Sequence, residues 1–176
     1  MSSSLKYIDE NDKAYGLAGM AISLLAWDAE EWLESINIDA PADAAMQMSA
    51  DFYLTLAPKV SAKALWEQAS KRFQLTAAMT VANVACRQMT LHHHASLSGE
   101  IDSELRSLLA DEGAELCGYE SDEVSRLYGR ALAYCSRLFN HSGVCRLADQ
   151  LAARILDART LDAPEIFTIL APLNRM

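Results

Sequence analysis

Hydrophobic residues recur along this chain at the three- and four-residue spacing typical of amphipathic helices, and no segment shows a strand-like alternation of matching quality. The spacing predicts a first helix from Asn11 or Asp12 to Ile36, followed by a turn at Pro41. The apolar side of that helix would carry Leu17, Ala21, Leu24, Leu25, Trp32 and Ile36. A second helix is expected from about Ala42 to Leu56, where an extended conformation of the stretch SADFYLTL, residues 49–56, is the alternative.

The longest predicted helix begins at Ser61, a favourable N-cap, and continues to about Thr90 or beyond. From Leu75 to Cys86 it is apolar all round, which is typical of a helix surrounded by other helices. Four further helices should follow, beginning near Ser98, Ser121, Ser142 and Asp162. We therefore predict an all-α fold, a compact single-domain bundle of six or seven helices over residues 1–176 with a long, largely buried third helix.

Neither a secretory signal nor a membrane span is predicted. The N-terminal residues MSSSLKYIDEND lack a basic region followed by an apolar core. The longest uncharged stretches, 14–27 and 73–86, hold 14 residues each, whereas a membrane span needs about 20. The four cysteines are 31, 18 and 10 residues apart, which matches no zinc or disulfide framework, so we expect reduced thiols and a cytoplasmic protein.

The net charge of −9 is concentrated at the start of the chain, where residues 1–60 hold 3 basic and 10 acidic residues. So acidic a protein repels a phosphate backbone, and we expect no nucleic-acid partner. Arg126, Arg130 and Arg137 share one face of a predicted helix, a pattern that is ordinary for a solvated helix face.

Four polar side chains break the helical pattern by pointing in the same direction as apolar neighbours. Asp28 falls among the apolar residues of the first helix, Asn83 and Arg87 among those of the third, and Glu112 among those of the fourth. Because a buried, unpaired charge costs several kcal/mol, we expect Asp28 and Arg87 to pair inside the bundle, with Asn83 or Glu112 close by. Such a pair would either fix the helix register or line a polar pocket, unless one of these residues lies at a helix edge or an interface.

Three of the four histidines are adjacent, at His92, His93 and His94. On a helix they point about 100° apart, so they make a poor chelator. Extending the third helix places His94 in line with Arg87. No Glu-x-x-His spacing of a di-iron bundle occurs, and we assign no metal ligand and no cofactor.

Two functions compete on this evidence. The first is a non-catalytic helical interaction or scaffold module that binds a protein partner or self-associates, with no nucleic-acid or membrane partner. The alternative is an enzyme or small-ligand binder whose polar pocket lies between the first, third and fourth helices. Its ligand-binding residues would be Asp28, Asn83, Arg87, His94 and Glu112. No residue is assigned a catalytic role, and metal binding by the histidine run is a third hypothesis.

Overall fold

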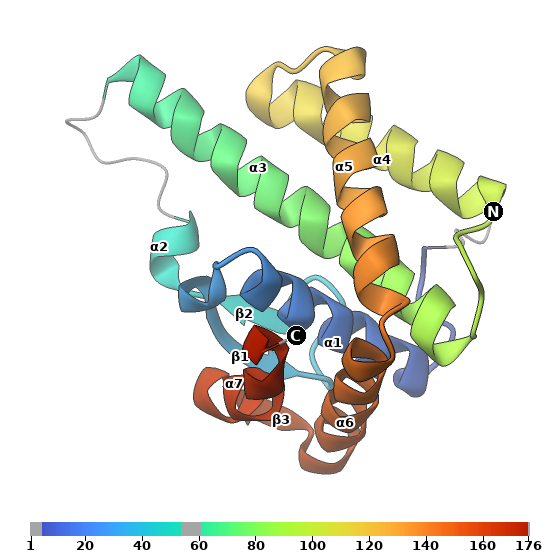
Figure 1. Ribbon diagram of the computed structural model, residues 1–176. Coiled ribbons are helices and arrows are strands. Elements are labelled where there is room, and N and C mark those ends of the chain that lie inside the picture. The colour runs from blue at the N-terminus through green and yellow to red at the C-terminus, as the bar shows by residue number, and fades with distance from the viewer. Residues whose placement is uncertain (1–4, 54–60, 176) are drawn as a thin grey trace.

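A computed structural model describes residues 5–53 and 61–175, and within those ranges it contains seven α-helices (Figure 1). They are α1 (Glu10–Ala26), α2 (Ala50–Tyr53), α3 (Ala62–Ala85), α4 (Gly99–Cys117), α5 (Ser121–Phe139), α6 (Ser142–Ala158) and α7 (Ala163–Leu170). A π-helix, η2 (Cys86–Leu91), continues α3, and η1 (Glu30–Trp32) and η3 (Ala171–Arg175) are 3₁₀ segments. The strands are β1 (Leu33–Asn37), β2 (Met46–Met48) and β3 (Thr160–Asp162). The predicted helical class and long third helix are confirmed, and a small sheet is added to them.

Four of the predicted helix ends are confirmed by the capping residue that marks them, whereas α6, which we expected Ser142 to cap, is capped by His141. The Ser61 and Ser98 hydroxyls each accept a hydrogen bond from the backbone N–H three residues later, at 3.3 Å, as N-caps do. Gly118 ends α4 with a φ of +66°, the left-handed conformation that glycine adopts at low cost. The Asp162 carboxylate caps α7 at 3.0 Å. These boundaries are encoded locally, because the capping side chain lies within a few residues of the helix end.

The first helix is much shorter than predicted. It ends at Ala26, because Asp28 has a φ of +50° and turns the chain out of the helix. Leu33 and Ile36 are buried, but from β1, where an irregularity in strand register lies between Leu33 and Ser35. A bulge of this kind brings residues three apart onto one face of a strand, which imitates the spacing of a helix.

The three strands form an antiparallel sheet in the order β2-β1-β3, although β3 follows β1 by more than 120 residues. In β2, Met46 and Met48 are buried and Gln47 is exposed. The helix predicted from Ala42 to Leu56 is therefore wrong over 46–48. The extended alternative concerned 49–56, and it is wrong over Ala50–Tyr53, because those residues form α2. Residues 54–56 of that prediction lie outside the described residues.

Helix α1 crosses α3 in the middle of the molecule at very close range (Figure 1). A Cβ atom built on Gly19 would lie 2.5 Å from the carbonyl oxygen of Ala82 and 2.6 Å from Cys86 Cβ. One built on Gly16 would lie 2.8 Å from the amide nitrogen of Asn83. Only glycine permits so close an approach of the two helices.

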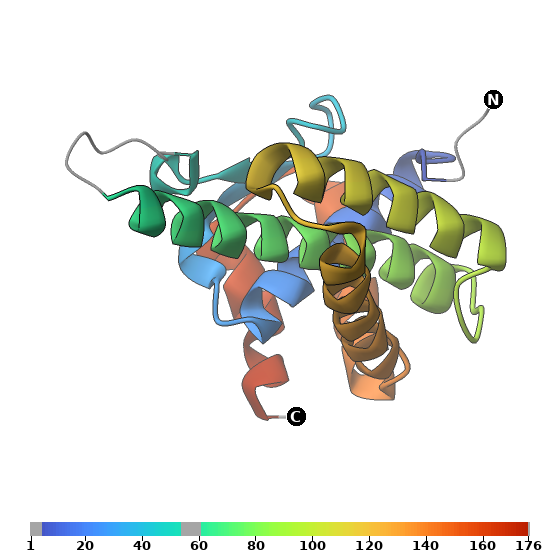
Figure 2. The same ribbon diagram turned by 90° about the horizontal axis from the view of Figure 1, so that it is seen from above.

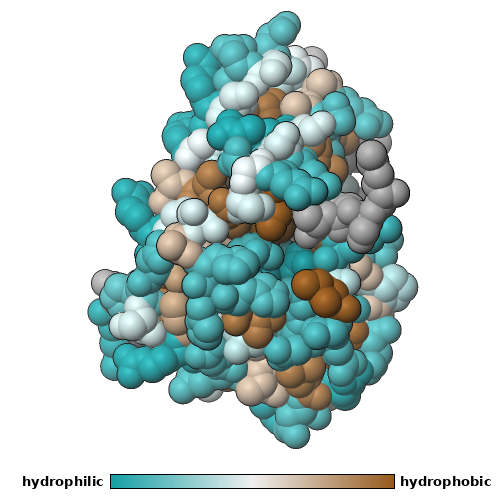
Figure 3. Space-filling model, turned by 90° about the vertical axis from the view of Figure 1, so that its right-hand side faces the viewer, coloured by the Kyte–Doolittle hydropathy of each residue, from teal (hydrophilic) through white to brown (hydrophobic). Residues whose placement is uncertain are grey.

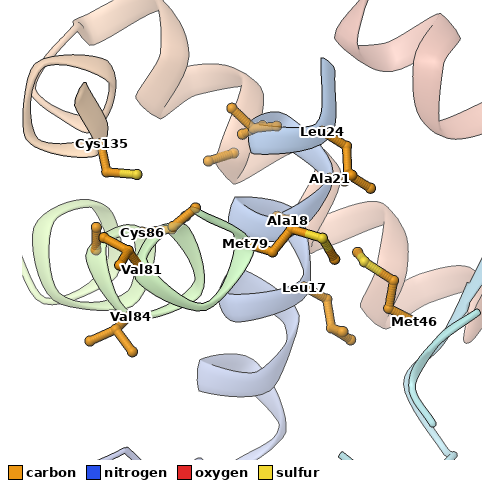
Figure 4. Close-up of a cluster of buried hydrophobic side chains, with 14 of the residues drawn as sticks. Leu17, Ala18, Ala21, Leu24, Met46, Met79, Val81, Val84, Cys86 and Cys135 are labelled. Carbon is orange, nitrogen blue, oxygen red and sulfur yellow. The ribbon is translucent and has the colours of Figure 1, made fainter. Parts of the chain in front are cut away.

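The other helices are packed around this crossing. Helices α4 and α5 cover α3, while α6, α7 and the sheet lie against α1 (Figures 1 and 2). The core therefore draws on distant segments, with Leu17 of α1, Met79 of α3 and Met46 of β2 in one cluster (Figure 4). Residues 81–90 are buried without interruption, whereas the N-terminal half of α3 is buried on one side only. Among the described helices, none is long and apolar enough to cross a membrane.

Candidate functional site

Of the five residues predicted to share a pocket, only Asn83 and Arg87 lie close together, on either side of Tyr7, and no hydrogen bond or ion pair among the described residues joins any two of the five. Asp28 is exposed beyond the end of α1, His94 is exposed beyond η2, and Glu112 is half-buried on α4. Asn83 and Arg87 are buried in α3 and η2. The predicted pairing of Asp28 with Arg87 is wrong.

Arg87 instead pairs with Asp12, and both side chains are only 1% exposed. The Arg87 Nε donates to Asp12 Oδ1 at 2.8 Å, and Nη2 lies 2.6 Å from Asp12 Oδ2. Nη1 and Nη2 also donate to the backbone carbonyls of Leu5 and Lys6, at 3.0 and 2.8 Å. Every nitrogen of the guanidinium group therefore has an acceptor, as a buried charge requires.

Asp12 is held from several sides. Its Oδ2 accepts a hydrogen bond from the backbone N–H of Ile8 at 3.0 Å, and His92 Nε2 lies 3.5 Å from its Oδ1. Burial by itself would raise the pKa of this carboxyl, but the hydrogen bonds from Arg87 and Ile8 outweigh that effect, so the pKa lies below its ordinary value. The carboxylate is therefore stabilised in its charged form.

Asn83 belongs to the same buried network through Tyr7. Its Nδ2 donates to the Tyr7 hydroxyl at 2.7 Å and lies 3.3 Å from the sulfur of Met20. The Arg87 guanidinium lies 4.9 Å from the centre of the Tyr7 ring, and burial raises the pKa of that tyrosine. These contacts attach the segment before α1 to the end of α3, a structural role in which the polar groups satisfy one another.

The antiparallel crossing of α1 and α3 explains why Asp12, rather than Asp28, reaches Arg87. Gly19 lies against Ala82, and Gly16 lies against Asn83, so the next turn of α1 towards its N-terminus meets Arg87. Asp12 resembles an ordinary first-turn acid in the sequence, where acids favour the helix dipole. The sequence signal that could have identified it is its spacing of four residues from Gly16, one helical turn along the contact face.

The histidine run begins where the π-helix ends. The backbone N–H of His92 donates to the carbonyl of Arg87, five residues earlier, so the wider turn places His92 above Arg87. An α-helix continued past Thr90 would have placed His94 in line with Arg87. Instead, the Nδ1 atom of His94 lies 3.0 Å from Gln88 Oε1. Among the described residues no group of three or more His, Cys, Asp or Glu side chains is arranged to hold a metal ion.

A hollow of about 690 Å³ does lie between α1, α3 and α4, the three helices predicted to enclose a pocket. Its lining is largely apolar, with Tyr7, Met20 and Leu105, and Asn83 is the one predicted site residue in it. On the face shown in Figure 3, hydrophobic residues gather in small separate patches on a mostly hydrophilic surface. Lys6 and Asp43 also line this hollow, so it offers a largely apolar wall with one amide and one charged residue of each sign.

A longer depression follows α5, which we call the α5 groove. It consists of three adjoining hollows of about 750, 450 and 390 Å³ on the side of α5 that faces α3 and the end of α1. The first two hollows share Gln74, Leu127, Arg130 and Ala133, and the second and third share Tyr134 and Arg137. From Glu123 to Leu138 the groove is about 22 Å long, at the helical rise per residue.

Aromatic rings line the α5 groove at two points. Near its start, the rings of Trp66 and Tyr119 pack edge to face with centroids 6.2 Å apart, and Trp66 is 51% exposed. Near the middle, the ring centroids of Trp27 and Tyr134 are 4.6 Å apart. The Trp66 indole N–H donates to the carbonyl of Cys117 at 3.2 Å, which fixes the ring on the surface. An exposed ring held in place, as that of Trp66 is, binds a partner with little loss of side-chain entropy.

Three arginines line the same groove, and they differ in whether the guanidinium group has a partner. Arg126 lies 2.9 Å from Asp122, one turn earlier on α5. The Arg137 guanidinium lies 5.9 Å from the centre of the Tyr134 ring. Arg130 has no hydrogen bond or ion pair with any described residue. The lining also contains Glu123 and Asp28, and Asp122 neutralises Arg126, so the arginines of the groove without a carboxylate partner among the described residues are Arg130 and Arg137.

The sequence predicts this arginine stripe on α5, but its spacing alone is typical of an ordinary solvated helix face. The aromatic residues beside it come from α1, from α3 and from the segment between α4 and α5, and no local pattern links those segments. Comparisons of the chain with protein-family models, with curated proteins and with solved structures found no match. Its function therefore has to be inferred from its own geometry.

Proposed function

We propose that this protein is a non-catalytic helical interaction module of the cytoplasm, and that the α5 groove binds an acidic, amphipathic helix of a protein partner. The observation that supports this most directly is the lining of the groove, in which the exposed Trp66 ring and half-buried Trp and Tyr rings lie beside arginines. Trp, Tyr and Arg are the residue types that dominate binding energy in protein interfaces. A groove about 22 Å long accommodates about four turns of helix.

The chemistry of the partner follows from the charges. Arg130 and Arg137 lack carboxylate partners among the described residues, and carboxylates are the groups that pair best with guanidinium. The aromatic rings between them favour an apolar stripe beside the acids. The net charge of −9 would by itself favour a basic partner, so the preference for an acidic helix is a local property of this groove.

The experiment is a titration of the full chain with a designed alanine-based helical peptide that carries glutamates in one stripe and leucines beside it. We expect saturable binding by calorimetry, and binding about tenfold weaker or worse for the Arg130→Glu and Trp66→Ala variants. A peptide of the same composition with lysine in place of glutamate is the matched control. If the basic peptide binds as well as the acidic one, or if neither variant weakens binding, the proposal is wrong.

A second candidate, binding of a small apolar molecule, is favoured by the hollow between α1, α3 and α4. Arg87 cannot serve as its anion clamp, because all its nitrogens are engaged. The Thr80→Trp change would fill this hollow, whereas Arg130→Glu changes only the α5 groove. A solvatochromic dye such as anilinonaphthalene sulfonate should lose its binding in the first variant alone if the hollow is the site.

A further inference from the structure

The acidic residues of α4 repeat the arginine spacing of α5 in reverse. On α5 the steps between Arg126, Arg130 and Arg137 are four and seven residues. On α4, counting backwards, Glu115, Asp111 and Glu104 are also separated by four and then seven residues. When two helices pack antiparallel, residues counted forward on one helix meet residues counted backward on the other. The two helices therefore have complementary charges in antiparallel register.

Two of the three acids in this stripe on α4 lie on the surface, and Glu104 is half-buried. Asp111 and Glu115 are exposed, and neither has a hydrogen bond or an ion pair with another described residue. Beside them, Leu108 and Leu116 are 37% and 52% exposed. Beside the stripe, the pKa of Glu112 is raised by partial burial and by the neighbouring charge of Glu115.

The position of the leucines distinguishes the two helix directions. On α5 the groove residues Leu127 and Tyr134 lie to one side of the arginine stripe, and on α4 Leu108 and Leu116 lie to the same rotational side of the acidic stripe. Antiparallel packing brings these two sides together. A parallel alignment, in which Glu100 would supply one acid, would turn the leucines away from the aromatic rings.

We propose that helix α4 of a second copy of this chain occupies the α5 groove, antiparallel to α5. Asp111 of one copy would then face Arg130 of the other, Glu115 would face Arg126, and Leu116 would lie against the exposed Trp66 ring. This inference rests on the proposed function and names the partner. It gives Arg130 the carboxylate that it lacks among the described residues of its own chain.

The contact joins two different surfaces, since the donor stripe on α4 and the α5 groove share no residue. It is therefore heterologous, and successive copies add head to tail into a ring or an open chain. The contact surface is a single helix face with exposed charges, so the association is weak and reversible and depends on protein concentration.

The test uses sedimentation velocity of the full chain from micromolar concentration upwards, at physiological ionic strength, where the repulsion due to the net charge of −9 is screened. We expect the average mass to rise with concentration. The single variants Arg130→Glu and Asp111→Arg should each remain monomeric, because each places like charges opposite one another. A mixture of the two variants should associate again, because each then finds an oppositely charged surface on the other.

Arg146→Glu is the matched control, an equal charge change at an exposed helix position on α6, outside both surfaces. It should associate as the wild type does, and all four proteins should show the same thermal midpoint. A wild type that is monomeric at every concentration would overturn the inference, as would a mixture of single variants that stays monomeric. Either result leaves binding of the designed acidic peptide unaffected, so failure of self-docking is distinguishable from failure of the proposed function.

Discussion

At the α1–α3 crossing the buried guanidinium of Arg87 has an acceptor for every nitrogen, whereas Arg130 in the α5 groove has no hydrogen bond or ion pair with any described residue. The difference follows from the exposure of each side chain to solvent. A charge removed from water must be satisfied within the fold, while an exposed charge remains hydrated and is available to a partner. Arg87, which breaks the apolar pattern of its helix, is thus structural. Arg130, which lies on an ordinary polar helix face, is the candidate for function.

Glycines show the same contrast. At the crossing, Gly19 touches the backbone of α3, whereas Gly129 in the groove has no atom within 4 Å of where its Cβ would lie. The crossing is therefore closed to any added atom, and the groove is open. Four predictions test this comparison, in order of decreasing effect.

The largest effect is expected for Arg87→Ala. Removing the guanidinium leaves Asp12 charged and buried, which should cost about 3–5 kcal/mol in the free energy of unfolding. Chemical denaturation followed by circular dichroism measures it. The double variant Arg87→Met, Asp12→Leu should recover much of the loss, because an apolar pair leaves no unpaired charge. A cost of less than about 1 kcal/mol for the single variant would show that the crossing does not depend on this pair.

Gly19→Ala should destabilise the protein by about 1–3 kcal/mol, because the methyl group would lie 2.5 Å from a carbonyl oxygen of α3. Gly129→Ala, the same change in the groove, should instead stabilise α5 by about 0.5–1 kcal/mol through its helix propensity. Thermal unfolding of the two variants in parallel compares the closed and the open region directly. Equal effects of the two changes would contradict the comparison.

The pH dependence of stability should reveal the Asp12 carboxylate. Its pKa is lowered in the folded state, so its contribution is present above its unfolded pKa of about 4 and is lost as the pH falls through the folded value. Asp12→Asn lacks this titration. The difference in unfolding free energy between wild type and variant should therefore narrow as the pH falls below about 4. A difference that stays constant down to pH 2 would mean that Asp12 does not titrate in this way.

The smallest effect is expected for Arg130→Ala. The side chain is exposed and has no described partner, so the change should alter the free energy of unfolding by no more than about 0.5 kcal/mol. Urea denaturation next to Arg87→Ala provides the comparison within one protein. A large loss of stability would show that Arg130 stabilises the folded state, and there would then be no reason to regard it as a binding residue.

Helix positions could be predicted wherever the signal was local. The caps at Ser61, Ser98 and Gly118 lie within a few residues of the ends that they define. The sheet could not be predicted, since β1 pairs with β3 from the far end of the chain and a bulge gives it helical spacing. The end of α1 was missed for the same reason, because the apolar spacing continues past Asp28 into that strand.

The candidate sites divide in a similar way. The sequence was sufficient to predict that Arg87 is buried and must have a partner, and that three arginines share one face of α5. It could not show which acid would meet Arg87, because the partner depends on the direction in which α3 crosses α1. It also could not show that Trp27, Trp66 and Tyr119 lie beside the arginine stripe.

The sequence by itself determined the helical class, the helix caps and the need to satisfy each buried charge, because these depend on periodicity and on interactions within one or two turns. Only the tertiary structure decided that Asp12 rather than Asp28 pairs with Arg87, and that a π-turn places His92 rather than His94 above it. The crossing of helices and the winding of one turn are set by packing across the whole chain. Packing across the whole chain also forms the groove beside the arginine stripe, because its aromatic walls come from segments far apart in the sequence.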